Sequence, residues 1–228
     1  MASLLKTLIK VLDCCMHVIA PVLKTTAYKV YWKIRPVDSN FDWELEIKKP
    51  YRLWLAKRIS ETNRPASVFE LGCGAGQNLA VASKFGRVRL AGVDFNPYRI
   101  ALGKKMFCAG GIDAELQVGS ENLAQFKNNE FDVSFTCAVL LYIGDDKIEM
   151  AVSELLRITR KGIWLVEFHD PTIKTSAARH ERDGYIRNYE LLFSSLGYNP
   201  VVDKLPDNLF PIAGKWPVYG YSIYVEKM

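Results

Sequence analysis

The fold class is decided by the stretch Val68-Phe69-Glu70-Leu71-Gly72-Cys73-Gly74-Ala75-Gly76. A short apolar run typical of a buried strand leads into a Gly-x-Gly-x-Gly turn, and a helical pattern follows. Glycines suit a loop that turns tightly and lets a ligand lie against bare backbone. Glu70, two residues before the first glycine, suits a ligand with a cationic group and suits a pyrophosphate poorly. A glycine-rich corner without a ligand is the structural alternative.

Outward from this stretch, strands and helices alternate as in a doubly wound parallel sheet. Apolar runs suited to buried parallel strands occupy residues 67–71, 88–94, 115–118, 132–137 and 163–168. Helical patterns occupy residues 77–85, 97–109 and 146–159, and a later helix ends at Leu196-Gly197. Short strands are expected near 198–203 and 218–225, where Tyr219, Tyr221, Ile223 and Val225 alternate with other residues. The sequence therefore predicts an α/β domain over residues 65–228.

Two further polar positions follow strands next to the glycine stretch. Asp94 closes the strand over 88–94, where a carboxylate can accept hydrogen bonds from both hydroxyls of a ribose lying over the glycine loop. Its structural alternative is to cap the helix that starts at Asn96-Pro97. Ser120 and Glu121 follow the third strand, where polar groups can meet the edge of an adenine.

Over about residues 66–168 these motifs, in this order and spacing, resemble class I S-adenosylmethionine (SAM)-dependent methyltransferases. The resemblance implies a seven-stranded sheet in the order 3-2-1-4-5-7-6 with an antiparallel last strand, SAM as the cofactor and methyl transfer as the reaction. It implies that the glycine loop contacts the methionine part and the sugar of SAM, and that Asp94 contacts the ribose. Ser120 and Glu121 stand where the family often has an aspartate near the adenine. The candidate cofactor-binding residues are Glu70, Gly72, Cys73, Gly74, Gly76, Asp94, Phe95, Asn96, Ser120, Glu121, Cys137 and Ala138, the last two lying at the exit of the fourth strand.

The candidate acceptor side lies past the carboxyl ends of the fourth and fifth strands, where ligands of open α/β sheets bind. Tyr142 stands where close relatives often have histidine, and His169 and Asp170 follow the fifth strand. His169 is either a general base that takes a proton from the acceptor or a strand-end histidine bonded to backbone. Strand four is not followed by an Asn-Pro-Pro-Tyr-like sequence, and Cys137 has no second reactive-looking cysteine nearby in sequence. By elimination, the acceptor atom is expected to be an oxygen of a small molecule, lipid or sugar.

Residues 1–64 are expected to form a helical extension. Apolar residues recur at helical spacing over 4–19, a second helix runs to about residue 33, and a third spans 43–60 with Asp42 as its N-cap and Pro50 as an internal bend. This extension holds 12 Lys and Arg against 6 Asp and Glu, whereas residues 65–228 hold 18 against 19. A lid over the acceptor site, packing on the domain and peripheral membrane contact through the N-terminal helix are all compatible with this pattern.

Composition limits the remaining classes of function. The 228 residues contain five scattered cysteines, which predict neither a disulfide framework nor a metal site. Without a signal-peptide pattern or a long uncharged apolar run, the expected location is the cytoplasm. Nucleic acid is not the expected partner, since no motif for reading it is present. Three alternatives to an active methyltransferase stay open: a catalytically inactive SAM-binding module, a nicotinamide-dependent oxidoreductase, which Glu70 and the glycine spacing disfavour, and an aminopropyl transferase.

Overall fold

The structure, a computed structural model, describes residues 7, 11, 21–36, 41–62, 64–175, 177–181, 184–210 and 215–227. The amphipathic helix expected over 4–19 lies outside the described residues except for Thr7 and Val11, both of which are helical and exposed.

Seven strands form one sheet in the order β3-β2-β1-β4-β5-β9-β8. Six of them run parallel, and β9 runs antiparallel to both of its neighbours, β5 and β8. The strands are β1 (Ser67–Leu71), β2 (Arg89–Asp94), β3 (Glu115–Val118), β4 (Phe131–Cys137), β5 (Thr159–Phe168), β8 (Val201–Lys204) and β9 (Gly220–Glu226). This confirms the expected seven-stranded order and the antiparallel last strand.

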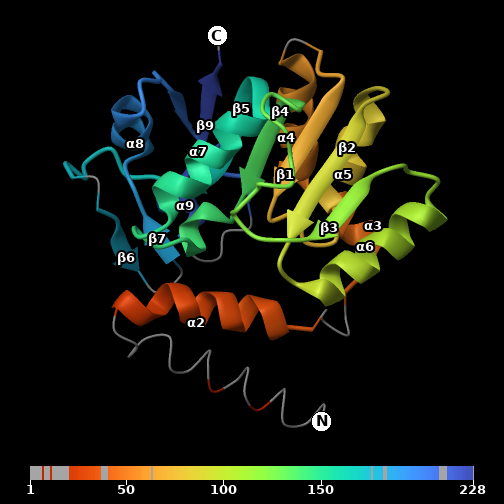
Figure 1. The fold of residues 1–228 in the computed structure, drawn as a ribbon, viewed down its shortest axis with the longest axis horizontal. Coiled ribbons are helices and arrows are strands. Elements are labelled where there is room, and N and C mark those ends of the chain that lie inside the picture. The colour runs from red at the N-terminus through yellow and green to blue at the C-terminus, as the bar shows by residue number, and fades with distance from the viewer. Residues whose placement is uncertain are drawn as a thin grey trace.

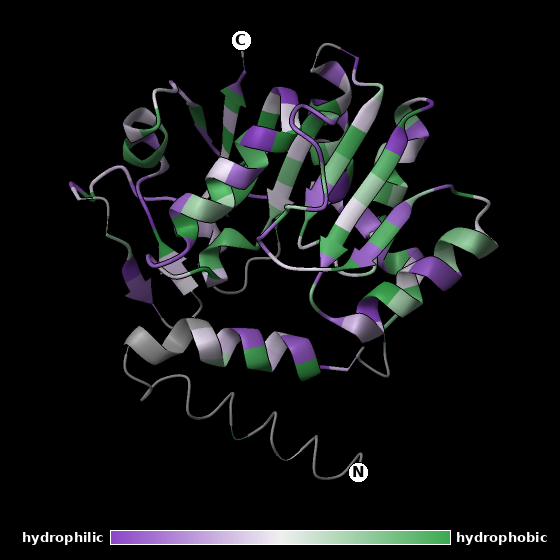
Figure 2. Ribbon diagram, viewed as in Figure 1, coloured by the Kyte–Doolittle hydropathy of each residue, from purple (hydrophilic) through white to green (hydrophobic). Residues whose placement is uncertain are grey.

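Helices cover both faces of the sheet (Figure 1). On one face the core joins α4, α5 and α6 to the strands, and on the other face it joins α7 and α8 to them. The strands are mostly hydrophobic along their length, and hydrophilic positions gather on the outer sides of the helices (Figure 2). The helices of these two layers are α4 (Pro50–Glu61), α5 (Gln77–Ala82), α6 (Pro97–Ala109), α7 (Ile148–Ile158) and α8 (Tyr189–Ser195).

The helix expected over 43–60 is two helices, α3 (Trp43–Ile47) and α4, so the prediction of a bend at Pro50 was wrong. Pro50 begins α4, where its missing N–H has no intrahelical partner to lose. Asp42 does cap α3, because its side chain accepts the N–H of Leu45 at 3.1 Å. The break between the helices turns α4 back against α5 and brings α3 to the carboxyl edge of the sheet.

Other boundaries also differ from expectation, by one to four residues. Strand β5 begins at Thr159 rather than at residue 163, because Thr159 pairs with Phe131 of β4 across an irregularity in the register. Helix α7 begins two residues after Asp146. The carboxylate of Asp145 instead accepts hydrogen bonds from Arg187 and from the backbone N–H of Ala178.

The carboxyl edge of the sheet is crossed by α2 (Pro21–Ile34), which lies below the strand tips in Figure 1. Next to α2 stand a hairpin of two short strands and the turn that follows β4, so three separate segments surround this edge. These smaller elements are η1 (Ser83–Phe85), η2 (Leu140–Tyr142), β6 (Arg179–Glu181), β7 (Gly184–Ile186) and α9 (Trp216–Tyr219).

Candidate active site

The loop between β1 and α5 has the conformation that its glycines permit. Gly72, Gly74 and Gly76 have φ of 73°, 57° and 83°, a left-handed region that other residues rarely adopt. A Cβ on Gly72 would lie 2.3 Å from a methyl carbon of Val139. A Cβ on Gly74 would meet nothing closer than 3.8 Å, because Gly74 borders an open cavity. The loop therefore packs tightly on one side and presents bare backbone on the other.

Asp94, at the tip of β2, holds this loop from below. Its Oδ2 accepts the N–H of Gly74 at 2.9 Å, and its Oδ1 accepts the N–H of Asn96 at 2.8 Å. The cap of α6 is Asn96, whose side chain accepts the N–H groups of Tyr98 and Arg99 at 3.0 Å each. A carboxylate offers about four acceptor positions, so Asp94 keeps capacity for donors of a ligand.

Glu70 is buried at the base of the cavity, with 1% of its surface exposed. Its Oε1 accepts a hydrogen bond from the amide of Asn78 at 2.6 Å, and Asn78 in turn accepts one from Arg52 at 2.6 Å. Its Oε2 accepts no hydrogen bond from any described residue. Burial raises the pKa of Glu70 to about 8, although the Asn78 hydrogen bond and the Arg52 charge oppose the shift. An unpaired buried acceptor of this kind fits a ligand that brings a cationic donor.

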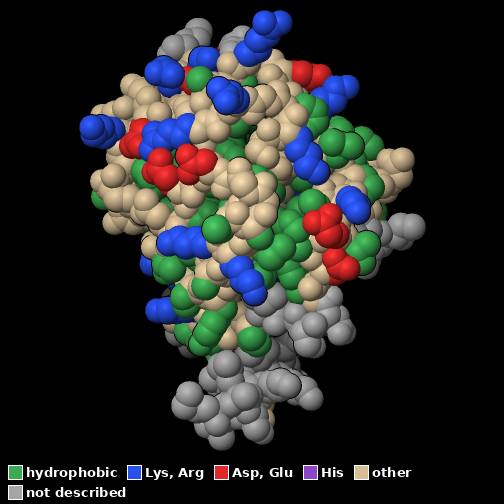
Figure 3. Space-filling view, turned by 90° about the vertical axis from the view of Figure 1, so that its right-hand side faces the viewer, with side chains coloured by type: hydrophobic (Ala, Val, Ile, Leu, Met, Phe, Trp, Pro, Cys, Tyr) green, Lys and Arg blue, Asp and Glu red, His purple; other side chains and the backbone are tan. Residues whose placement is uncertain are grey.

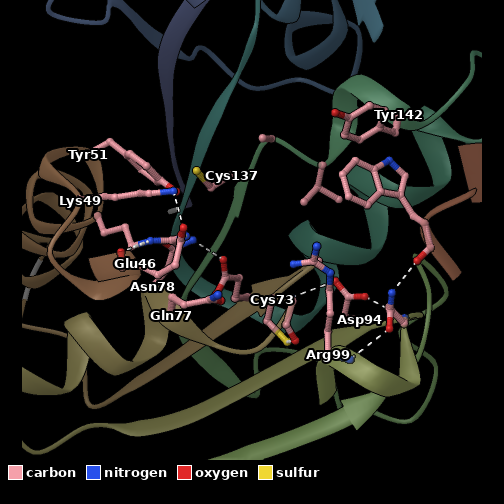
Figure 4. Close-up of a pocket in the computed structure, with 18 of the residues that line it drawn as sticks. Glu46, Lys49, Tyr51, Cys73, Gln77, Asn78, Asp94, Arg99, Cys137 and Tyr142 are labelled. Atoms are coloured by element: carbon pink, nitrogen blue, oxygen red, sulfur yellow. Dashed lines mark hydrogen bonds and ion pairs between the residues drawn. The ribbon is translucent and has the colours of Figure 1, made fainter. Parts of the chain in front are cut away.

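These groups line one cavity of about 610 Å³ at the carboxyl edge of the sheet (Figure 4). Cys137 lies between two halves of it. One half is the glycine-loop side, with Asp94 and Arg99, and the other is the side of α3 and α4, with Lys49 and Tyr51. The lining residues are Trp32, Phe41, Glu46, Lys49, Tyr51, Arg52, Glu70, Gly72, Cys73, Gly74, Gln77, Asn78, Asp94, Phe95, Asn96, Arg99, Cys137, Ala138, Val139, Tyr142, Phe210 and Trp216.

A smaller hollow of about 40 Å³ adjoins the cavity under α2. Its walls are mostly apolar and include Tyr28, Val93 and Ile143, and Glu121 lies at its edge. Glu121 pairs with Lys29 of α2 and lies 3.8 Å from Lys147. Burial alone would raise the pKa of Glu121, but the Lys29 hydrogen bond and the two cations hold it below its usual value. Helix α2 is therefore attached to the third-strand loop by a buried carboxylate.

Comparison with known proteins agrees with this geometry. A protein-family model described as a methyltransferase domain matches residues 68–162, and no curated protein matches the sequence. One similar structure is the geranyl diphosphate C-methyltransferase from Streptomyces coelicolor A3(2), solved with Mg²⁺, geranyl diphosphate and S-adenosyl-L-homocysteine. It superposes with a TM-score of 0.66 and 13% sequence identity, and the match covers 90% of this chain and 98% of that one. A SAM-dependent methyltransferase from Aquifex aeolicus superposes with a TM-score of 0.59 at 14% identity over 82% and 99%. The [4+2]-cyclase SpnF gives 0.62 at 15% identity over 77% and 81%.

Residues 68–162 thus match a methyltransferase domain, and the fold is the one that the solved SAM-dependent methyltransferases share. The family match over these residues, together with the seven-stranded fold, points to SAM-dependent methyl transfer as the chemistry to test. The cavity suits SAM, because it combines bare glycine backbone, a carboxylate at the tip of β2 and a buried acceptor without a donor. None of these comparisons identifies the acceptor.

The methyltransferase domain brings ten of the expected cofactor-binding residues to the cavity or the adjoining hollow. Gly76 and Ser120 are not among the described lining residues. Gly76 stands at the N-cap of α5, and a Cβ there would lie 2.8 Å from the ring of Phe107. Close packing against Phe107 therefore explains why position 76 is a glycine. The lining residues from the expected set are Glu70, Gly72, Cys73, Gly74, Asp94, Phe95, Asn96, Glu121, Cys137 and Ala138.

His169 does not line the cavity of the methyltransferase domain, although its sequence position suggested that it would. It is 1% exposed, and its Nδ1 accepts the N–H of Tyr189, the first residue of α8, at 3.1 Å. Burial lowers the pKa of His169 despite the nearby charges of Glu190 and Asp170. The backbone-bonded interpretation therefore describes its geometry, because β9 and α8 cover the end of β5.

Asp170 also points elsewhere, since its carboxylate accepts hydrogen bonds from Thr172 and from Arg179 at 2.9 Å. It does not orient the His169 ring. Tyr142 does line the cavity, where it packs against Tyr28 and Trp32 of α2 with ring centroids 5.1 and 5.2 Å apart.

Glu167, next to the end of β5, lies behind the wall of the cavity. It is fully buried, and its carboxylate accepts hydrogen bonds from the hydroxyl of Thr136 at 2.8 Å and from the N–H groups of Val139 and Leu141 at 3.0 and 3.1 Å. These bonds hold the exit of β4, where Ala138 has a φ of 58°. Glu167 thus positions the loop that faces the cavity.

Sequence reasoning missed the lining residues that come from outside the glycine-loop region. Arg52 is a buried arginine on a helix whose sequence suggests exposure, so a hydropathy pattern does not reveal it. Phe210 and Trp216 reach the site only because the chain returns to it between β8 and β9. Gln77 and Asn78 had a local signal, because both stand in the first turn after the glycine loop. The missed residues are Trp32, Phe41, Glu46, Lys49, Tyr51, Arg52, Gln77, Asn78, Arg99, Val139, Phe210 and Trp216. Within the described ranges, no three His, Cys, Asp or Glu side chains gather as a metal site would require.

Proposed function

We propose that this chain is a SAM-dependent methyltransferase that binds SAM with its methionine part along Glu70, Gly72 and Gly74. The unpaired Oε2 of Glu70 is the observation that carries this assignment, because the amino group of the methionine part is a donor that it lacks. Arg52 of α4 reaches Glu70 through Asn78 from the α3–α4 side of the cavity.

The other end of SAM follows from the same orientation. Asp94 would accept hydrogen bonds from the ribose hydroxyls, with Phe95 and Asn96 beside it. The hollow under α2 has room for only a few waters, so the adenine would lie at its mouth, beside the cavity, with Glu121 among the lining residues. The methyl group would then lie near Cys137 and Ala138, next to the half of the cavity that α3 and α4 line.

We further propose that the acceptor is a small molecule methylated on oxygen, with lipids and sugars as the other classes considered. The cavity supports a small acceptor, because 610 Å³ is within the usual range of pockets for small ligands and it must also hold SAM. On the face around β3 and α6, Lys and Arg side chains lie among Asp and Glu rather than in a patch that would bind nucleic acid (Figure 3).

SAM supplies a methyl group on a positively charged sulfur. The chain's residues contribute alignment: Glu70, Asp94 and the glycine loop hold one reactant, and the α3–α4 side holds the other at the correct distance. Tyr142 and Trp32 help to keep water out by covering the opening under α2.

The test is to incubate the full chain with isotope-labelled SAM and a small-molecule extract, and to identify labelled products by mass spectrometry. A labelled small molecule supports the proposal. Asp94→Ala should weaken SAM binding at least tenfold, because each hydrogen bond to an ionised acceptor contributes about 1.5–3 kcal/mol. SAM binding without any labelled product would favour the inactive binding module.

We propose a cytoplasmic location, which the free thiols of Cys73, Cys108 and Cys137 support. No helix among the described residues is long and apolar enough to cross a membrane. For the N-terminal extension, a lid or packing role is preferred to membrane contact. Deleting residues 1–20 should then lower turnover or stability and leave vesicle binding unchanged. Strong vesicle binding that is lost on deletion would reverse this preference.

A further inference from the structure

The half of the cavity beyond Cys137 has an aromatic wall. The rings of Tyr51 and Phe210 are stacked with centroids 4.4 Å apart and planes 16° apart, and Phe210 and Trp216 are stacked at 4.3 Å and 9°. Phe168 packs against Trp216 at 4.7 Å in an edge-on arrangement. The guanidinium of Arg52 lies 4.8 Å from the centroid of the Tyr51 ring. Phe210 is therefore stacked between Tyr51 and Trp216, and Arg52 and Phe168 contact the two outer rings.

A wall of rings stacked in this way presents ring edges to the cavity. Ring edges carry partial positive charge, so they attract the face of an electron-rich conjugated ring in the edge-to-face arrangement. The same wall leaves little open ring face for a methylated or protonated amine, which binds best over such a face. The aromatic wall thus favours a flat, conjugated acceptor over a cationic one.

The charges at this end of the cavity agree with that preference. Lys49 pairs with Glu46 at 2.6 Å, and Arg52 pairs with the same carboxylate at 3.0 Å. Two cations therefore share one anion. The ammonium of Lys49 lies on the Tyr51 side of the cavity together with Cys137 (Figure 4). This excess positive charge favours an anionic acceptor atom and disfavours an ammonium group.

The described side chains at this end supply no proton acceptor suited to neutral pH. Burial raises the pKa of both Tyr51 and Cys137, so both stay protonated. Both oxygens of Glu46 are bound to cations, which lowers its pKa even though burial alone would raise it. Glu70, Cys73 and Asp94 belong to the proposed SAM site, where the free oxygen of Glu70 is assigned to the amino group of SAM. An alkyl hydroxyl would need a base to become nucleophilic, whereas an acidic hydroxyl can lose its proton to water.

We propose that the acceptor is a flat conjugated compound with an acidic hydroxyl, of the phenol or enol class, bound as its oxyanion between the aromatic wall and Lys49. The inference rests on the proposed function. The hydroxyl proton leaves to water, and the oxygen then forms a bond to the methyl carbon as the carbon–sulfur bond breaks. The electron pair of that bond stays on sulfur, which loses its positive charge.

The first experiment compares matched acceptors with labelled SAM. Aromatic skeletons of one, two and three fused rings are each tested with a hydroxyl, a hydroxymethyl and an amino group, after SAM binding has been verified by calorimetry. At least one aryl hydroxyl should be methylated about a hundredfold faster than its hydroxymethyl and amino counterparts. Its rate should rise with pH toward the pKa of the free acceptor. Equal or faster transfer to an alkyl alcohol or amine overturns the proposal, as does SAM binding without transfer to any aryl hydroxyl. A protein that does not bind SAM would instead contradict the proposed function.

The second experiment tests Lys49. Lys49→Gln should raise KM for the aryl hydroxyl about tenfold and move the pH–rate profile to higher pH, while the Kd for SAM changes less than twofold. Lys48→Gln is the matched control, because Lys48 is exposed, precedes Lys49 and does not line the cavity. An unchanged KM and pH profile in Lys49→Gln would show that the oxyanion does not bind at this end.

Discussion

At the scale of single residues, the carboxyl of Glu70 is buried, and its Oε2 has no hydrogen-bond donor among the described residues. In the unfolded chain it ionises near 4.5, whereas in the folded protein its pKa is about 8. Between these values ionisation favours the unfolded chain, so this group's contribution to stability is largest below pH 4.5 and is lost as the pH rises through 8. A cationic group on a ligand would lower the pKa of Glu70 again, because it stabilises the ionised carboxylate.

SAM binding at pH 7 should therefore release about one proton, and SAM affinity should rise with pH until about pH 8. Calorimetry in two buffers with different ionisation enthalpies measures the proton count. Glu70→Gln keeps an acceptor for Asn78 and should release none. The same proton release from Glu70→Gln and the original chain would mean that another group titrates.

Gly74 is the second residue whose role can be isolated, because Gly111 shares its backbone conformation. Their φ angles are 57° and 62°, and a Cβ on Gly111 would meet nothing within 4 Å. Valine at either position should cost about 1–2 kcal/mol of stability through the left-handed backbone. Only Gly74→Val should also abolish SAM binding, because only that side chain enters the cavity. Binding curves that match for the two folded variants would contradict the assignment of the glycine loop.

At the scale of elements, His169 connects the end of β5 to the start of α8. His169→Ala removes the acceptor for the buried N–H of Tyr189, which should lower the free energy of unfolding by about 1–3 kcal/mol. Turnover per folded molecule should change less than fivefold, and the acidic limb of the pH–rate profile should persist. Denaturant unfolding and pH–rate measurements check this. A loss of turnover of about 10²-fold or more in folded protein would restore His169 as a general base.

The C-terminal half of helix α2 is attached to the domain by polar contacts as well as by its aromatic rings. Lys29 binds Glu121, and about one turn further along the side-chain amide of Asn96 donates to the carbonyls of Trp32 and Arg35 at 2.6 and 2.7 Å. Because α2 covers the hollow whose mouth is proposed for the adenine, SAM release requires this helix to lift. Lys29→Gln should therefore speed SAM dissociation by about tenfold, equivalent to about 1.4 kcal/mol. Lys33→Gln, an exposed change on the same helix, is the control in stopped-flow measurements. Equal dissociation rates in both variants would mean that α2 does not limit release.

At the scale of the whole molecule, SAM should stabilise the fold because it joins the glycine loop, α2 and the α3–α4 side. At 100 times its Kd it should add about 2.7 kcal/mol. For a chain of this size that corresponds to a rise in Tm of about 5–10 °C. NADH at the same concentration should leave Tm unchanged. Stabilisation by NADH and not by SAM would favour the oxidoreductase alternative and contradict the assignment as a methyltransferase.

The sequence by itself determined the parts of this protein that depend on neighbouring residues. The three glycines, the acid before them, the acid at the tip of β2 and the strand runs predicted the sheet and most of the cofactor side, because backbone conformation and strand burial are local properties. Tertiary structure decided which side chains share the cavity. Arg52 and Asn78 meet Glu70 only because α4 packs on α5, and Phe210 and Trp216 reach Tyr51 only because the chain returns along β9. His169 was placed correctly at a strand end, yet the packing of α8 and β9 turned it away from the cavity. Contacts between distant segments depend on how the layers pack, and no pattern within one segment records that packing.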